Sequence, residues 1–146
     1  MYIVFGLGNP GRQYQLFRHN IGFMLLDYLQ EYYKIPFYPA KGDYYFANLK
    51  MDSSEVLLVK PMTYMNLSGE AVYDFMKPRQ IGLSDIIVVY DDVSLPLGKI
   101  RIKTKGGDAG HKGVRSIIQH MGTENFIRIR AGIGRPPEGI SSTDYV

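Results

Sequence analysis

Two apolar runs constrain the fold of this chain more than any other feature of its sequence. Residues 2–7 form one run, which ends in a glycine-rich segment, and residues 86–90 form another, which is followed by Asp91 and Asp92. Continuous apolar runs of this length are typical of strands that are buried on both faces inside a largely parallel sheet. In α/β proteins, the segments directly after such strands carry the functional sites.

Helical and strand-like patterns alternate along the rest of the chain. Apolar spacing and helix-ending prolines or glycine predict helices over residues 20–34, 68–77 and 114–121. Further strands are predicted over residues 44–50, 55–60, 99–103 and 126–131. Asn20 is expected to cap the first helix, and the last residues are expected to be irregular. This order predicts an α/β fold with a mixed, mostly parallel twisted sheet and helices on both faces.

Length and composition indicate one domain over residues 1–146. The chain has 146 residues, of which 45% are hydrophobic, as in ordinary globular domains. No apolar run approaches the roughly 20 residues that a transmembrane helix needs. The first residues lack the basic start of a signal peptide, and there is no cysteine for disulfides or thiolate zinc sites. We therefore expect a cytoplasmic protein.

Positive charge is concentrated in one stretch. The formal net charge is only +3, but basic residues crowd the segment from Lys99 to Arg115, with Asp108 as the only acid inside it. Such a stretch is either a solvated surface or a contact for a polyanion. Its glycine-rich part offers backbone amides for phosphates, and His111 adds a further basic group.

The segment Gly6–Gly11, GLGNPG, matches the G-x-G-x-x-G pattern of dinucleotide sites. Such a site requires a helix that begins at the third glycine, so that its N-terminus faces the pyrophosphate. Here Pro10 and a polar segment intervene, and the helix is predicted to begin near Asn20. A tight glycine turn that presents the side chain of Asn9 is the better interpretation.

His19 lies just before the first predicted helix, in Arg18-His19-Asn20. The positive end of a helix disfavours protonated imidazole, so such a histidine stays neutral and can act as a base near neutral pH. Taken alone, a histidine in this position is more often a capping or solvated loop residue.

Two other polar segments adjoin predicted strands. In KPMTYMNLSG, residues 60–69, Asn66 is a candidate to orient a water or to donate to a developing oxyanion. The alternative is that Asn66 and Ser68 cap the next helix. Asp91 and Asp92 are candidates to orient a histidine, to bind a metal or to form a turn. A metal is disfavoured because no further carboxylate or histidine cluster with ligand spacing is evident.

Together and in this order, these segments resemble bacterial-type peptidyl-tRNA hydrolases. The matching segments are GLGNPG with Tyr14 and RHN-x-G, then KPMTYMNLSG, YDDVSLPLGKIR, KGGDAGHKGVRS and FIRIRAGIGRP, which cover nearly the whole chain. The resemblance implies an enzyme that hydrolyses the ester between a peptide and the 3′ end of tRNA, and we expect this protein to be a monomer. The same resemblance implies tRNA as the partner, and no metal or nucleotide cofactor.

The resemblance also implies roles for individual residues. His19 matches the general base that activates a water, and Asp92 the acid that hydrogen-bonds His19 and fixes its tautomer. The positions that bind the substrate are matched by Asn9, Tyr14, Met65, Asn66 and Lys112. The positions that bind tRNA phosphates are matched by Lys103 and Arg130.

The chain departs from the family pattern at two side chains. Lys112 stands where the family usually has an asparagine that binds substrate and positions the water. Lysine cannot accept a hydrogen bond and brings a positive charge, so we expect either reduced activity or a phosphate contact. Phe17 stands where a threonine is common, which is expected to matter less.

A further departure concerns the C-terminal helix that the family carries beyond the segment resembling residues 142–146. Without that helix, we expect exposed apolar surface, which would allow the otherwise monomeric chain to self-associate. Lys112 and the missing helix favour an alternative function, an RNA-binding paralogue with lost or weakened hydrolysis. His19, Asp92, Asn9 and Asn66 oppose this alternative, because binding alone needs no base and no orienting acid.

Overall fold

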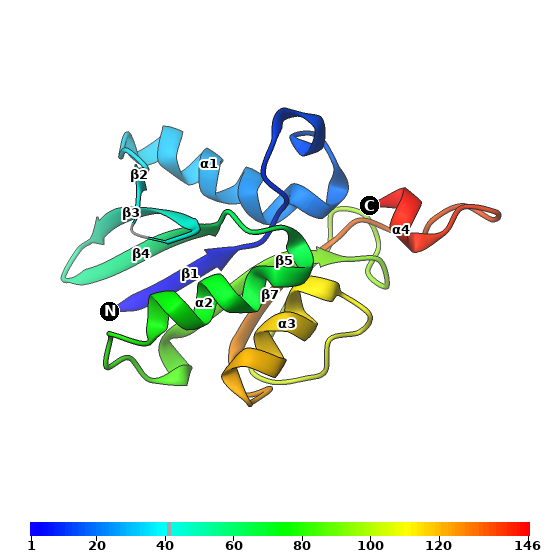
Figure 1. Cartoon of the computed structure of the whole chain (residues 1–146). Helices are drawn as coiled ribbons and strands as arrows, with labels where there is room; N and C mark the ends of the chain where they lie inside the picture. Colours follow the sequence, from blue (N-terminus) through cyan, green and yellow to red (C-terminus); the bar gives the residue numbers. More distant parts are fainter. Residues whose placement is uncertain (41) are drawn as a thin grey trace.

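The computed structural model describes residues 1–40 and 42–146, which form one mixed sheet with helices on both faces (Figure 1). The strands are β1 (Tyr2–Gly6), β2 (Tyr38–Pro39), β3 (Tyr44–Met51), β4 (Ser54–Pro61), β5 (Ile86–Asp92), β6 (Ile100–Lys103) and β7 (Ile127–Gly132). Their order in the sheet is β2-β3-β4-β1-β5-β7-β6. The predicted α/β class with a mixed sheet is confirmed.

Parallel pairing is confined to the centre of the sheet. β1 runs parallel to β4 and β5, and β5 runs parallel to β7. The outer pairs, β2 with β3, β3 with β4, and β6 with β7, are antiparallel. The predicted parallel character therefore applies to the four central strands. Their position explains the continuous apolar runs, since Ile3, Phe5 and Val88 are fully buried, whereas the edge strand β6 is exposed along its length.

The helices form a layer on each side of the sheet. The α-helices are α1 (Ile21–Tyr33), α2 (Ser68–Met76), α3 (Lys112–Met121) and α4 (Ser142–Tyr145), and the 3-10 turns are η1 (Arg12–Tyr14), η2 (Arg18–Asn20), η3 (Met65–Leu67) and η4 (Leu83–Asp85). α1 packs Leu26 against Ala47 and Leu58 on one face. α2 and α3 cover the opposite face, where the larger core lies. None of the helices in the described residues is long and apolar enough to cross a membrane.

The elements observed follow the predicted ones within a few residues. α3 begins at Lys112, two residues earlier than predicted, because the His111 side chain accepts a hydrogen bond from Val114 N and caps the helix. The C-terminal residues include the single turn α4, which Ser141 caps, so they are not wholly irregular. β2 is too short to give a periodic signal.

The topology places a site at the carboxyl ends of β1 and β5, which are neighbours in the sheet. The chain leaving β1 continues into α1 on one face, whereas the chain leaving β5 forms the edge strand β6 and then α3 on the other face. Ligand sites of open α/β sheets form where successive connections diverge in this way.

Gly22 brings α1 into contact with this edge of the sheet. A Cβ at Gly22 would lie 2.3 Å from Leu7 N and 2.6 Å from Val89 O, both backbone atoms. A Gly→Ala change in a helix usually stabilises it by about 1 kcal/mol, but here the helix would have to move away from the strands. We expect Gly22→Ala to lower the free energy of unfolding by about 3 kcal/mol and the thermal midpoint by roughly 10 °C, as measured by denaturant and thermal melts.

Gly82→Ala is the matched control. The nearest atom to a Cβ at Gly82 is Ser84 Oγ at 3.7 Å, and its backbone is extended with φ of −72°. This variant is expected to keep or slightly raise the thermal midpoint. Equal midpoints for the two variants would contradict the close packing inferred for Gly22.

Candidate functional site

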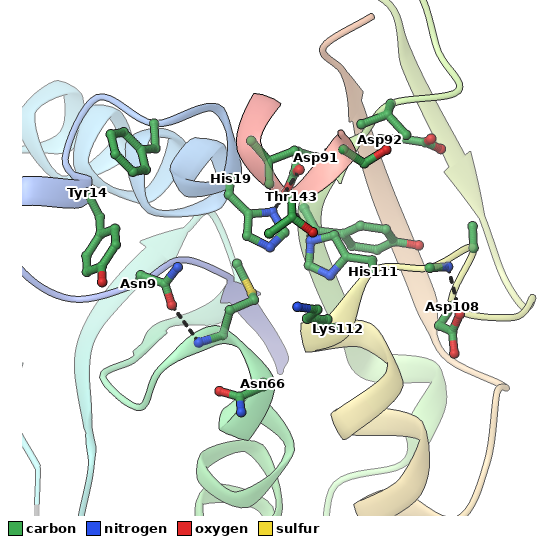
Figure 2. Close-up of a pocket in the computed structure, with 18 of the residues that line it drawn as sticks. Asn9, Tyr14, His19, Asn66, Asp91, Asp92, Asp108, His111, Lys112 and Thr143 are labelled. Carbon is green, nitrogen blue, oxygen red and sulfur yellow. Dashed lines mark hydrogen bonds and ion pairs between the residues drawn. The ribbon is translucent and has the colours of Figure 1, made fainter. Parts of the chain in front are cut away.

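A cavity of about 580 Å³ opens at the carboxyl ends of β1 and β5 (Figure 2). Its walls come from the loop after β1, the segment after β4, the end of β5, the loop before α3 and the C-terminal residues. Among the lining residues are Asn9, Tyr14, His19, Met65, Asn66, Asp91, Asp92, His111 and Lys112. All predicted catalytic and substrate-binding residues therefore surround one cavity.

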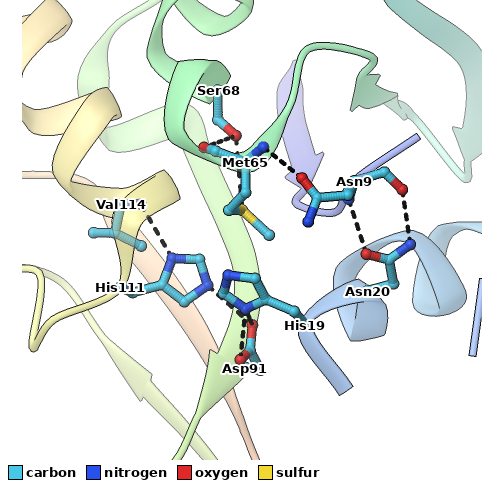
Figure 3. A network of polar contacts seen from close by, with 8 residues as sticks. All are labelled: Asn9, His19, Asn20, Met65, Ser68, Asp91, His111 and Val114. Atoms are coloured by element: carbon cyan, nitrogen blue, oxygen red, sulfur yellow. Dashed lines mark hydrogen bonds and ion pairs between the residues drawn. The ribbon is translucent and has the colours of Figure 1, made fainter. Parts of the chain in front are cut away.

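Asp91, and not Asp92, holds His19. His19 Nδ1 lies 2.8 Å from Asp91 Oδ1 and 2.9 Å from Asp91 Oδ2 (Figure 3). Successive side chains of a strand point to opposite faces. Asp92 consequently accepts hydrogen bonds from Ser94 N at 2.8 Å, Ser94 Oγ at 2.6 Å and Arg130 Nη1 at 3.0 Å. The prediction that Asp92 orients His19 is wrong, and the neighbouring acid takes that position.

His111 is a second histidine on the same carboxylate. His111 Nε2 lies 2.9 Å from Asp91 Oδ1, and His111 Nδ1 accepts from Val114 N at 3.3 Å. The two imidazole centroids are 4.6 Å apart. Burial lowers the pKa of His111, although Asp91 acts in the opposite direction. The sequence marks His111 only as a basic residue of the glycine-rich loop, because its contact with Asp91 depends on where the start of α3 packs.

The electrostatics keep Asp91 ionised. Burial alone would raise the pKa of Asp91, but hydrogen bonds from His111 and His19 outweigh it and hold the pKa well below its ordinary value. An ionised carboxylate only accepts hydrogen bonds, so the proton of a neutral His19 is assigned to Nδ1. The lone pair of the ring is then on Nε2, which is the basic atom of His19.

These three groups are hydrogen-bonded in a way that does not fit a metal ion. One atom from each of His19, Asp91 and His111 lies within 4.8 Å of the others. Asp91 Oδ1, however, is 2.8 Å and 2.9 Å from the two nitrogens, whereas two ligands of a tetrahedral zinc lie roughly 3.3 Å apart. His111 Nδ1 accepts from Val114 N, so the proton of the neutral ring is on Nε2. Nε2 therefore has no lone pair with which to bind a metal.

Asn9 and Asn20 fix the loop after β1. Asn20 is buried; its Oδ1 accepts from Asn9 N at 2.8 Å and its Nδ2 donates to Asn9 O at 2.9 Å (Figure 3). Asn20 is the N-cap residue of α1, as predicted, but its side chain makes no capping hydrogen bond. Asn9 Oδ1 accepts from Met65 N at 2.6 Å. The NH2 group of Asn9 is consequently the part of this side chain that can donate to a ligand in the cavity.

The glycine segment does not fit a dinucleotide site. α1 begins at Ile21, and both η1 and η2 lie between it and Gly11. Within the described residues, only the single 3-10 turn η1 begins at these glycines, and it is too short to supply the α-helix N-terminus that a pyrophosphate would require. This agrees with the interpretation of the segment as a tight turn that carries Asn9.

Aromatic side chains form another wall of the cavity. The ring of Tyr14 meets the rings of Phe17 and Tyr64 edge to face, with centroids 5.6 Å and 6.4 Å away. Sequence reasoning did not single out Tyr64, although it lies in KPMTYMNLSG.

Asn66 is an exposed residue that lines the cavity. The alternative that Asn66 and Ser68 cap α2 is wrong, because α2 has no side-chain cap.

The two predicted phosphate contacts lie around a separate cavity of about 280 Å³. Lys103 is exposed there, whereas the Arg130 side chain is only 13% exposed and pairs with Asp92. Arg128, which is buried, donates to Gly107 O at 2.8 Å and to Gly106 O. Arg128 therefore stabilises the glycine-rich loop, and Lys103 is the more available of the two predicted contacts.

The C-terminal residues close the cavity beside His19. His19 N donates to Val146 O at 3.1 Å, and Arg18 Nη1 donates to Tyr145 O at 3.1 Å. Tyr145 is held in turn by its hydroxyl, which donates to Ile133 O at 2.7 Å. The turn that carries His19 is thus fixed from both sides.

Comparison with known proteins identifies the family. Residues 3–146 match the family described as Peptidyl-tRNA hydrolase. Over all 146 residues, the chain is 49% identical to the peptidyl-tRNA hydrolase of Geobacillus kaustophilus and 47% identical to that of Bacillus subtilis, covering 78% of each relative. The crystal structure of peptidyl-tRNA hydrolase from Acinetobacter baumannii is similar over the whole chain and 74% of its own length, with a TM-score of 0.93 and 37% identity. The chain therefore belongs to the peptidyl-tRNA hydrolase family.

Proposed function

We propose that this protein hydrolyses the ester bond between the peptide and the 3′ end of tRNA in peptidyl-tRNA, with His19 as the general base. The observation that carries the proposal is the pairing of His19 Nδ1 with the buried Asp91 carboxylate, which leaves the lone pair of Nε2 available in a cavity. Because its substrate is a tRNA of translation, we propose that the protein acts in the cytoplasm.

The chemistry needs only a water, a base and hydrogen-bond donors. His19 Nε2 takes a proton from the water as its oxygen attacks the ester carbonyl, and Asp91 stabilises the imidazolium that forms. The tetrahedral intermediate then collapses, the bond to the ribose oxygen breaks, and the imidazolium returns its proton to that oxygen. The products are free tRNA and a peptide with a new carboxyl group.

The walls of the cavity offer groups that suit the peptide and the 3′ end of the tRNA. The NH2 groups of Asn9 and Asn66 are donors for a peptide carbonyl or for the oxyanion of the intermediate. The aromatic rings of Tyr14 and Tyr64 offer surfaces on which a base or an apolar side chain stacks, and Met65 adds an adaptable apolar contact. These groups support the proposal that the cavity binds the ester and its neighbouring groups.

The test is release of free tRNA from an N-blocked aminoacyl-tRNA, with the His19→Ala variant as the reference. Release by the wild-type protein that depends on His19 is expected. Tight tRNA binding without release by either protein would contradict the proposal and would favour the alternative of an RNA-binding paralogue.

Lys112 is expected to limit the rate. Its side chain lines the cavity, but it cannot accept a hydrogen bond from the attacking water, as an amide oxygen can. We predict that Lys112→Asn raises kcat several-fold in the tRNA-release assay. Lys112→Met is the control, because it removes the charge without adding an acceptor. A kcat for Lys112→Asn no higher than that of the wild type would refute this explanation.

Lys103 is proposed to contact a tRNA phosphate. It is exposed beside the smaller cavity, and a phosphate contact there would release a counterion on binding. Lys103→Ala is expected to weaken tRNA binding and to reduce the slope of log affinity against log salt by about 1. Lys50→Ala, at an exposed position of β3, is the control. An unchanged slope for Lys103→Ala would argue against the contact.

A further inference from the structure

The carboxylate of Asp91 accepts hydrogen bonds from two histidines. Its Oδ1 accepts from His19 Nδ1 at 2.8 Å and from His111 Nε2 at 2.9 Å, although the donors come from η2 and from the start of α3 (Figure 3). The reaction proposed above uses only the hydrogen bond to His19. The second hydrogen bond is buried and well placed, and the chemistry of the ester does not by itself require it.

The tautomer of His111 is set by the helix that follows it. His111 Nδ1 accepts from Val114 N in the first turn of α3, so this nitrogen carries no proton and Nε2–H is the donor to Asp91. A proton on Nδ1 would face the N–H of Val114 at the positive end of the helix, which disfavours it. Burial lowers the pKa of His111 as well. His111 is therefore a fixed neutral donor and not a second base.

A fixed donor on Asp91 changes what Asp91 does to His19. A carboxylate stabilises imidazolium through its charge, and a second hydrogen bond to the same oxygen disperses part of that charge. His111 thus weakens the stabilisation of protonated His19 while it holds the carboxylate in one orientation. The ring of Tyr90 packs against the ring of His111, with centroids 4.9 Å apart, which helps to hold the donor in position.

The other charged groups near Asp91, His19 and His111 are paired with one another, bound to a backbone carbonyl, or exposed in the wall of the cavity. Asp92 pairs with Arg130, and Asp108 pairs with Arg115. Arg18 binds the carbonyl of Tyr145. Lys112 from α3 and Asp144 from the C-terminal segment line the cavity. Among the described residues, His19 and His111 are the side chains that form hydrogen bonds with the carboxylate of Asp91.

We propose that His111 is a positioning residue for the hydrolysis: it fixes the Asp91 carboxylate for His19 and sets the pH range over which His19 is in its basic form. This inference rests on the proposed function of His19. It assigns His111 a part in catalysis without contact with the substrate.

Two variants separate the hydrogen bond to Asp91 from the cap of α3. In His111→Asn, the side-chain oxygen can still cap α3, but the side chain is too short to reach Asp91. In His111→Gln, the amide NH2 takes the place of Nε2, whereas the cap is lost. We expect His111→Asn to lower kcat about tenfold and to move the acid limb of the pH–rate profile upward by roughly half a pH unit. His111→Gln should be less stable but should keep the acid limb of the wild type.

Titration of His19 by NMR of ¹⁵N-labelled imidazole tests, without substrate, whether His111 affects the protonation of His19. The chain has three histidines, so the His19→Ala spectrum assigns the resonance. A higher titration midpoint in His111→Asn, with the wild-type midpoint in His111→Gln, is the expected result. Unchanged midpoints in both variants, or equal shifts in both, would overturn the proposal. Because no tRNA is present, this result is separate from the tRNA-release assay, whose failure would count against the proposed function alone.

Discussion

His19→Ala is expected to reduce kcat for tRNA release by roughly 10²–10⁴-fold, the usual contribution of a general base. Among the residues that the structure describes, His19 is the one histidine of the cavity that has a free lone pair on one ring nitrogen and a buried carboxylate bonded to the other. His111 cannot replace it, because both of its nitrogens are already engaged. Single-turnover kinetics with N-blocked aminoacyl-tRNA measure the effect on the chemical step.

The control for this prediction is His120→Ala. His120 is an exposed residue of α3 whose Nδ1 lies 2.9 Å from Ser116 O, away from the cavity. This variant should keep its activity, and His19→Ala should keep its affinity for tRNA. Loss of activity in both variants, or retention in both, would contradict the assignment of the base.

Asp91→Asn is expected to lower kcat by roughly 10²-fold or more, since it removes the charge that stabilises the imidazolium and allows the wrong tautomer of the base. His19 Nδ1 lies within 2.9 Å of both oxygens of Asp91. An asparagine amide therefore places both its oxygen and its NH2 group next to Nδ1. It carries no charge to stabilise the imidazolium, and its NH2 group favours the tautomer with the proton on Nε2, in which the atom that should accept the proton of the water is a donor.

Asp92→Asn is the matched control, because it makes the same change at the adjacent residue. Asp92 bonds Ser94 and Arg130, so this variant is expected to lose some stability and to change kcat only a few-fold. The same tRNA-release assay compares the two variants. A larger loss of activity in Asp92→Asn than in Asp91→Asn would show that the pairing of His19 with Asp91 is not the one used in catalysis.

The sequence by itself determined the framework and most of the site. The apolar runs at β1 and β5 predicted buried strands, because strands covered on both faces need apolar side chains throughout. The glycine turn, the segment around Asn66 and the basic loop were recognisable because each follows or precedes a strand end. The roles of His19 and Asn9 could be assigned only because the order of these motifs resembles a known family, since His19 taken alone is more often a capping or solvated residue.

Only the tertiary structure decided which groups meet in that site. β5 is buried on both faces, so its sequence lacks the polar–apolar alternation that would reveal which of Asp91 and Asp92 points to His19. The side chain of Asn20 bonds Asn9 instead of capping α1, because the loop after β1 packs against it. His111 reaches Asp91 only because α3 packs at the end of β5. These contacts join residues 11 to 72 positions apart, and local sequence patterns carry no information on such distances.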